Sequence, residues 1–156
     1  MDKGLGNLNA SEIDELLLNS CIGRIGCSAN SRTLVVPITY AYDGERILAH
    51  TTVGEKVAMM RENPSVCFEV DQVDDLRNWQ SVIIQGSYRE LQGSEASIAM
   101  AYLVEKLLLR LPSESAMLGN GAWTIRPKPT VGESETVLFC IDITEKRGRY
   151  EKWKTH

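Results

Sequence analysis

Residues 50–56 bring together side chains that could bind an anion. The segment reads His-Thr-Thr-Val-Gly-Glu-Lys, and a helix is predicted to begin directly after its glycine. Thr51 and Thr52 offer hydroxyl donors, while Gly54 allows a phosphate group to approach the backbone. Lys56 adds a mobile point charge, and the first-turn amides of a helix add about half a positive charge. The pattern indicates a phosphate site; the alternative is an ordinary turn with a solvated lysine. The GxxxxGK[ST] spacing of a Walker loop is absent.

His50 is the only histidine besides the terminal His156. At the predicted end of a strand and beside the anion segment, it suits a proton donor or acid near a bound ring. The alternative is a histidine that is hydrogen-bonded at the rim of the fold. One internal histidine and scattered cysteines argue against a transition-metal site, so no metal is expected.

Trp79 and Ser81 form a second group of candidate residues. One residue separates them, so in a strand their side chains lie on the same face. Trp79 could cover a planar ligand; packing against the end of a barrel is the alternative. No Gly-x-Ser-x-Gly elbow surrounds the serine, so a Ser-His-Asp triad is not predicted.

The elements that must position these residues are mostly strands. We predict strands over 21–29, over two runs within 33–52 that flank the turn pair Asp43-Gly44, and over 65–71, 79–91 and 135–143. Gly86 predicts a bulge in its strand. Because Pro37 has no N–H to donate, the side of the strand where that N–H would lie is predicted to face an edge, a bulge or a ligand. Helices are predicted over 12–20 after a Ser11 cap, over 55–62, and over 95–111 after a Ser94 cap. Residues 71–78 are predicted to be a polar loop and the last thirteen a charged tail, while 112–135 show little periodicity.

This order of elements favours a mainly β fold with helical inserts. Sequential strands with three helices do not suit a doubly wound parallel sheet, whereas hairpin-linked antiparallel strands can close into a small barrel. A chain of 156 residues favours a single domain over 1–156.

Bulk composition narrows the range of partners and compartments. A net charge of -4 argues against a nucleic-acid binder. The four cysteines form no CxxC pair, and neither a signal peptide nor a membrane-spanning stretch is recognisable. We therefore expect a cytoplasmic protein with reduced thiols and no membrane partner.

Several motifs occur together and in order between residues 13 and 92. They are the strand proline Pro37, Asp-Gly, the histidine after the third strand, Gly-x-Lys, Arg-x-Asn-Pro, Cys-Phe-Glu-Val-Asp, and Trp-x-Ser-Val ahead of a glycine. In this combination the chain resembles the pyridoxamine 5'-phosphate oxidase-related FMN-binding split-barrel family, closest to the branch of the nitroimidazole-resistance proteins.

The resemblance implies a six-stranded antiparallel split β-barrel that forms a homodimer, with FMN in clefts between the subunits. It places the backbone of Val36, Pro37, Ile38 and Thr39 along the isoalloxazine, His50 and Thr51 by the ribityl chain and phosphate, Lys56 on the phosphate, and Trp79 and Ser81 at the flavin. Two positions depart from the family: Gln80, where many relatives have arginine, and Glu55, where the oxidase proper has a basic residue. The C-terminal residues that bind the oxidase's substrate have no match here, so pyridoxamine phosphate oxidation is not expected.

Three functions are compatible with this resemblance. The first is an FMN-dependent oxidoreductase that reduces a small planar substrate, such as a nitro-aromatic, by hydride transfer through the flavin, with His50 as the candidate acid. The second is a flavin-binding module without turnover. The third is a split barrel that binds another ligand, such as haem or a deazaflavin.

Overall fold

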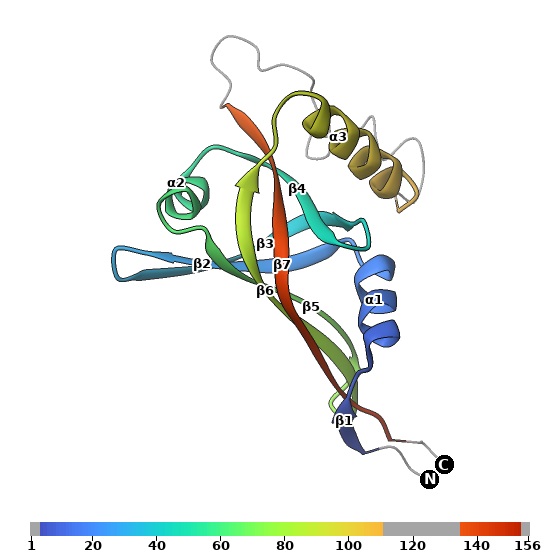
Figure 1. The fold of residues 1–156 in the computed structure, drawn as a ribbon. Coiled ribbons are helices and arrows are strands. Elements are labelled where there is room, and N and C mark those ends of the chain that lie inside the picture. Colours follow the sequence, from blue (N-terminus) through green and yellow to red (C-terminus); the bar gives the residue numbers. More distant parts are fainter. Residues whose placement is uncertain (1–3, 111–134, 154–156) are drawn as a thin grey trace.

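The computed structural model describes residues 4–110 and 135–153, which form seven strands and three helices (Figure 1). In chain order these are β1 (Leu5–Asn7), α1 (Ala10–Asn19), β2 (Ile22–Ala29), β3 (Arg32–Tyr42), β4 (Arg46–Thr52), α2 (Glu55–Glu62), β5 (Ser65–Asp75), β6 (Asn78–Glu90), α3 (Gly93–Leu108) and β7 (Thr136–Glu151). None of the described helices is long and apolar enough to cross a membrane.

Six of the strands close into a ring. Antiparallel pairing runs in the order β7-β4-β3-β2-β5-β6, and β6 pairs back onto β7. The short β1 attaches to the outer end of β7. The prediction of a mainly β, six-stranded antiparallel barrel with helical inserts is therefore confirmed, with β1 as an addition that no pattern indicated.

The ring is split where β3 and β4 separate. β3 pairs with β2 from Arg32 to Thr39, but it pairs with β4 only over residues 40–42. β4 then leaves β3 and follows β7, with His50 opposite Leu138. Along residues 32–39, one edge of β3 thus has no strand partner in the described part of the chain.

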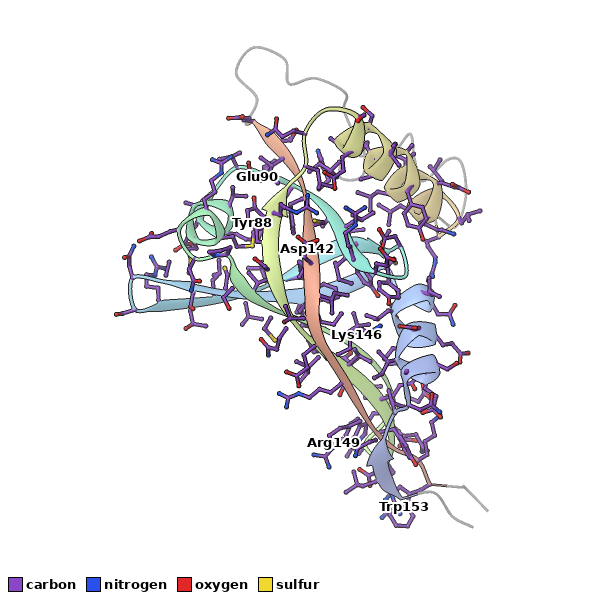
Figure 2. All side chains as sticks on the ribbon, in the orientation of Figure 1. Tyr88, Glu90, Asp142, Lys146, Arg149 and Trp153 are labelled. Carbon is purple, nitrogen blue, oxygen red and sulfur yellow. The ribbon has the colours of Figure 1, made fainter. Side chains whose placement is uncertain are left out.

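Two predicted irregular segments are strands, because their backbones pair with neighbouring strands. The predicted loop over 71–78 is wrong, because β5 continues to Asp75 and pairs with β6 up to a tight turn at Leu76-Arg77. The predicted charged tail is also wrong over residues 144–151, which continue β7 and pair with both β6 and β1. Figure 2 shows Lys146, Arg149 and Trp153 succeeding one another along and just beyond this strand. Arg147 and Arg149 are exposed there, whereas Lys146 pairs with Asp14 of α1 at 2.8 Å.

The helix starts also differ from prediction by a few residues. Asn9, not Ser11, caps α1: its side chain accepts the Glu12 N–H at 2.9 Å, and Glu12 reaches back to the Asn9 N–H. α3 begins at Gly93 without a side-chain cap, so Ser94 is inside the helix. The α2 bounds agree with prediction. The segment 112–134, together with the predicted end of the third helix at 111, lies outside the described residues.

The core fills the barrel and extends under α3. Tyr40 and Phe68 lie fully inside with their ring centroids 4.9 Å apart in an edge-to-face arrangement. α1 closes one end of the barrel by burying Ile13, Leu16 and Leu17. α3 covers the outside of β3, β4 and β7 through a second cluster that includes Leu103 and Leu138. The bulge predicted at Gly86 is confirmed by a register shift beside it, where a Cβ would lie 2.6 Å from the Asp142 carbonyl oxygen.

Candidate functional site

The open edge of β3 presents backbone polar groups. Tyr40 donates its N–H to the Cys21 carbonyl of the β2 side at 2.9 Å. Because hydrogen-bonding direction alternates along a strand, Val36 and Ile38 also bond toward β2, while Pro37 and Thr39 face the open edge. Pro37 has no N–H, so it leaves no unsatisfied donor at this edge.

The side chains of these four residues divide between two faces. Ile38 is buried, and Val36 packs against the core. Pro37 is exposed and Thr39 is half-buried on the outward face. Val36 and Ile38 therefore have their side chains in the barrel, and Pro37 and Thr39 are the two whose polar backbone groups face the edge.

His50 and Thr51 occupy β4 just beyond the point where it leaves β3. Both are half-buried, and their backbones pair with β7. Burial lowers the pKa of His50, so the imidazole is neutral at pH 7. A neutral imidazole donates one hydrogen bond and accepts another.

Lys56 lies in the first turn of α2 beside the same opening. The N-cap of α2 is Gly54, which has no side chain to cap the first-turn N–H groups. Lys56 is half-buried, and burial lowers the pKa of its ammonium group. In the described part of the chain no carboxylate lies within 4.0 Å of it. A half-buried cation without a counter-ion favours the arrival of an anion.

Glu55, which departs from the family pattern, is engaged elsewhere. Its carboxylate pairs with the Arg32 guanidinium at 2.8 Å. Arg32 follows the two-residue Asn30-Ser31 turn that joins β2 to β3, a hairpin that sequence reasoning did not identify.

The Arg-x-Asn-Pro motif holds α2 in place. Arg61 pairs with Glu90 at 2.6 Å, and Tyr88 donates to the same carboxylate at 2.8 Å. Figure 2 shows Tyr88 and Glu90 on β6 next to α2. Asn63 donates its side-chain N–H to the Ser28 carbonyl at 2.9 Å. These contacts tie both sides of α2 to the barrel and so position Lys56.

Trp79 and Ser81 lie elsewhere on the barrel. Both are half-buried on β6 and face outward, and the Trp79 indole donates to the Glu151 carboxylate at 3.1 Å. β2 and β5 separate β6 from β3 in the sheet, which amounts to about 14 Å at the usual strand spacing. Within one chain, the structure thus brings together the β3 edge and residues 50–56, but not Trp79 and Ser81.

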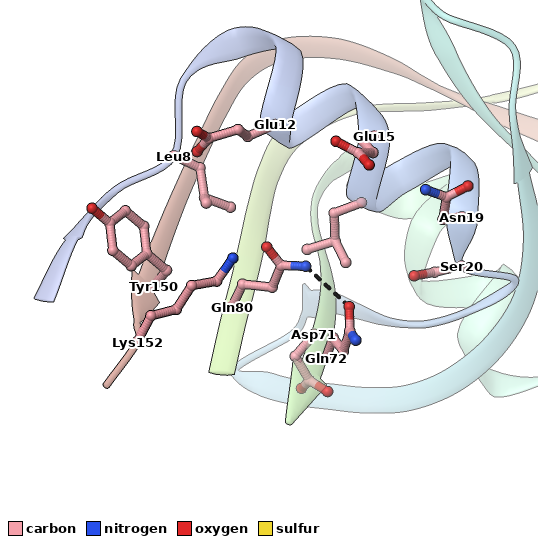
Figure 3. Close-up of a pocket in the computed structure, with 11 residues that line it drawn as sticks. Leu8, Glu12, Glu15, Asn19, Ser20, Asp71, Gln72, Gln80, Tyr150 and Lys152 are labelled. Carbon is pink, nitrogen blue, oxygen red and sulfur yellow. Dashed lines mark hydrogen bonds between the residues drawn. The ribbon is translucent and has the colours of Figure 1, made fainter. Parts of the chain in front are cut away.

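Two hollows were not predicted from the sequence. One, of about 530 Å³, lies between α1 and the ends of β5, β6 and β7, and includes Glu12, Glu15 and Lys152 (Figure 3). In it Gln80, the other departure from the family pattern, donates to Gln72 at 3.0 Å. The second, of about 550 Å³, lies on the outward face around Gly26 and includes Arg24, Cys67 and Glu69. Residues from four strands, β2, β3, β5 and β6, line this second hollow, so spacing along the chain could not have revealed it.

A ring of six antiparallel strands that opens between β3 and β4 defines a split β-barrel. A family model described as "Pyridoxamine 5'-phosphate oxidase" matches residues 9–150, and the chain belongs to that family. The resemblance indicated by the motifs is confirmed.

Individual relatives agree with this assignment. An uncharacterised protein of Rhizobium meliloti (strain 1021) is 29% identical over 128 residues, covering 82% of this chain and 83% of its own. The crystal structure of an FAD-binding protein from Mesorhizobium loti is 26% identical with a TM-score of 0.74, covering 94% of this chain and 96% of its own. A proposed 5-nitroimidazole antibiotic resistance protein from Bacteroides thetaiotaomicron shares the fold, with a TM-score of 0.66, 13% identity, and coverage of 96% and 90%.

Proposed function

We propose that the protein is an FMN-binding oxidoreductase that works as a homodimer. The observation that carries this proposal is the opening between β3 and β4. A free backbone edge runs along it, and a half-buried lysine without a carboxylate partner among the described residues stands at one end. FMN has matching parts: a planar ring with hydrogen-bonding groups on its rim and one terminal phosphate.

The residues around the opening fit such a ligand. The edge from Arg32 to Thr39 extends for roughly 20 Å at the usual rise per residue, which accommodates a three-ring system and its side chain. A Cβ added at Gly54 would meet nothing within 4 Å, so a group can approach the first-turn amides of α2. In this proposal Lys56 and these amides hold the phosphate, and Pro37 and Thr39 bond the ring.

A second copy of the chain supplies what one copy lacks. Trp79 and Ser81 are too far around the sheet to reach the opening of their own chain, yet they share the outward face with Pro37 and Thr39. That face also exposes Ile22 and Val35, to 52% and 65%. Burying it against a second copy would cover this apolar surface and carry Trp79 and Ser81 toward the other copy's flavin.

When bound, FMN would supply the hydride-transfer chemistry for a small planar substrate such as a nitro-aromatic. The chain would hold the ring in one orientation along β3, and a second copy would exclude water from it. His50 is the candidate acid; because burial lowers its pKa, it would meet the substrate as a neutral ring that donates a hydrogen bond from one nitrogen.

The cofactor assignment is tested by releasing and identifying the bound chromophore, and by titrating the apoprotein with FMN and riboflavin. Lys56→Met should weaken FMN binding by about 1–3 kcal/mol, the scale of a charge-assisted hydrogen bond. Riboflavin, which lacks the phosphate, should bind equally to both proteins. Lys152→Met removes a charge from the hollow near α1 and serves as the matched control. An equal loss for both ligands, or release of haem or a deazaflavin, would overturn the assignment.

Turnover and assembly need separate measurements. Anaerobic reduction of the bound flavin by NADH or NADPH, followed by reoxidation with a nitroimidazole, should show single-turnover kinetics that scale with acceptor concentration. Flavin reduction without acceptor-dependent reoxidation would indicate a non-catalytic flavin module instead. Light scattering at micromolar concentration should give twice the 17.4 kDa chain mass, and a monomer would contradict the shared site.

A further inference from the structure

Glu55 stands one position before Lys56, at the start of α2. A carboxylate there would oppose a phosphate dianion bound by the neighbouring lysine, because like charges repel. In the folded protein Glu55 is paired with Arg32 at 2.8 Å. The two side chains are exposed to 50% and 73%, so the pair contributes little to folding stability.

The turn between β2 and β3 places Arg32 next to Glu55. Asn30 and Ser31 have φ values of 50° and 63°, as the central residues of a tight hairpin turn of type I′ require. This turn makes Arg32 the first residue of β3, opposite Ala29.

The tip of this hairpin is also fastened to the other end of α2. Asn30 donates to the Glu62 carboxylate at 2.9 Å, and Asn63 donates to the Ser28 carbonyl at 2.9 Å. The contacts therefore run along the helix from its first turn to its C-cap. A hairpin attached at both ends of α2 holds the guanidinium over Glu55.

We propose that Arg32 is a positioning residue for the cofactor phosphate: it neutralises Glu55, so that the charge at the start of α2 is that of Lys56 alone. This inference rests on the proposed function and adds a residue to it. Arg32 acts through Glu55 and does not touch the phosphate. Arg32 of β3 thus offsets the charge of Glu55, which stands where the oxidase proper has a basic residue.

The test is a charge-compensation series titrated with FMN and with riboflavin. Arg32→Gln should weaken FMN binding by about threefold to tenfold at low salt, the range for an exposed charge acting through water on a dianion, and the loss should shrink as salt rises. Glu55→Gln should bind FMN at least as tightly as the unaltered protein. The double variant should return to within about twofold of it, because the local net charge is restored.

Riboflavin affinity should stay constant across the series. Lys106→Gln, which removes one positive charge from α3, should leave FMN affinity unchanged. Thermal melts check that each variant is folded.

Two results would overturn the inference while leaving the phosphate site in place. One is an Arg32→Gln variant with unaltered FMN affinity. The other is a double variant as weak as Arg32→Gln, which would mean that Arg32 contacts the phosphate itself or that the loss is structural. If Lys56→Met in the same titrations leaves FMN affinity unaltered, or weakens FMN and riboflavin equally, the phosphate assignment fails, and the role of Arg32 fails with it.

Discussion

Glu69 should make the stability of this protein depend on pH. Glu69 and Asp71 lie on the outward face of β5 and share one guanidinium, that of Arg24 on β2. The Arg24 Nη1 atom is 3.3 Å from a Glu69 oxygen and 3.2 Å from an Asp71 oxygen. Burial, followed by the adjacent Asp71 carboxylate, raises the pKa of Glu69 from 4.5 to about 7, against the opposing effect of Arg24.

The sign of the effect follows from proton binding. A raised carboxyl pKa means that, between pH 4.5 and about 7, the folded state holds more protons than the unfolded state. Stability from this group is therefore fully present below pH 4.5 and is lost as pH rises through about 7.

The difference between the two pKa values also sets the size of the change in unfolding free energy. It corresponds to at most about 3 kcal/mol. The side chains of Arg24 and Asp71 are 50% and 34% exposed, so water screens the cluster and about 1–3 kcal/mol is expected.

The assay compares the unaltered protein with Glu69→Gln by guanidinium denaturation at about pH 5 and about pH 8, at one fixed protein concentration because association shifts apparent stability. Titrating groups outside this cluster are common to both proteins, so they cancel in the comparison. The unaltered protein should lose about 1–3 kcal/mol more than Glu69→Gln over this interval. Parallel pH profiles would refute the reasoning, because they would mean that Glu69 ionises in the folded state as it does in the unfolded chain.

Two further predictions concern local structure. Asn9→Ala should cost about 1 kcal/mol of unfolding free energy through loss of the α1 capping box, while Ser11→Ala should be nearly neutral. Equal effects of these two substitutions in chemical denaturation would contradict the cap assignment. Gly23→Ala should cost about 1–3 kcal/mol or more, because its Cβ would lie 2.3 Å from a Phe68 ring carbon and 2.9 Å from the Glu69 carbonyl oxygen. Gly26→Ala, whose nearest contacts are at 3.8 Å, is the control, and an equal melting shift for both would show that the approach at Gly23 is not tight.

Local signals in the sequence predicted much of the fold. Asp43-Gly44 marks a true hairpin turn, with Gly44 at a φ of 96° that favours glycine. The apolar periodicity of 13–17 predicted the buried face of α1, and the Gly86 bulge was visible as a glycine within a strand. Each of these depends on residues a few positions apart, so a pattern along the chain is enough to read them.

One error occurred where the pairing partners are distant in sequence. Residues 144–151 are polar and look like a tail, yet they bond to β6 and β1. A strand with one solvated face needs little apolar content if its backbone is satisfied on both sides. Asp71–Asp75 are a local case: they pair with Asn78–Ser81 across a two-residue turn, and their polar composition alone suggested a loop.

In the candidate site, too, some features could be predicted from the sequence and others only from the tertiary structure. The sequence alone identified the segment from His50 to Lys56 and the strand proline, because ordered motifs carry family membership. Only the tertiary structure decided that β3 and β4 separate beside that segment, that Arg32 pairs with Glu55, and that β6 lies across the sheet. The physical reason is that charge pairing and strand pairing depend on distance in space. Residues 32 and 55 become neighbours only when the hairpin and α2 pack against the same barrel.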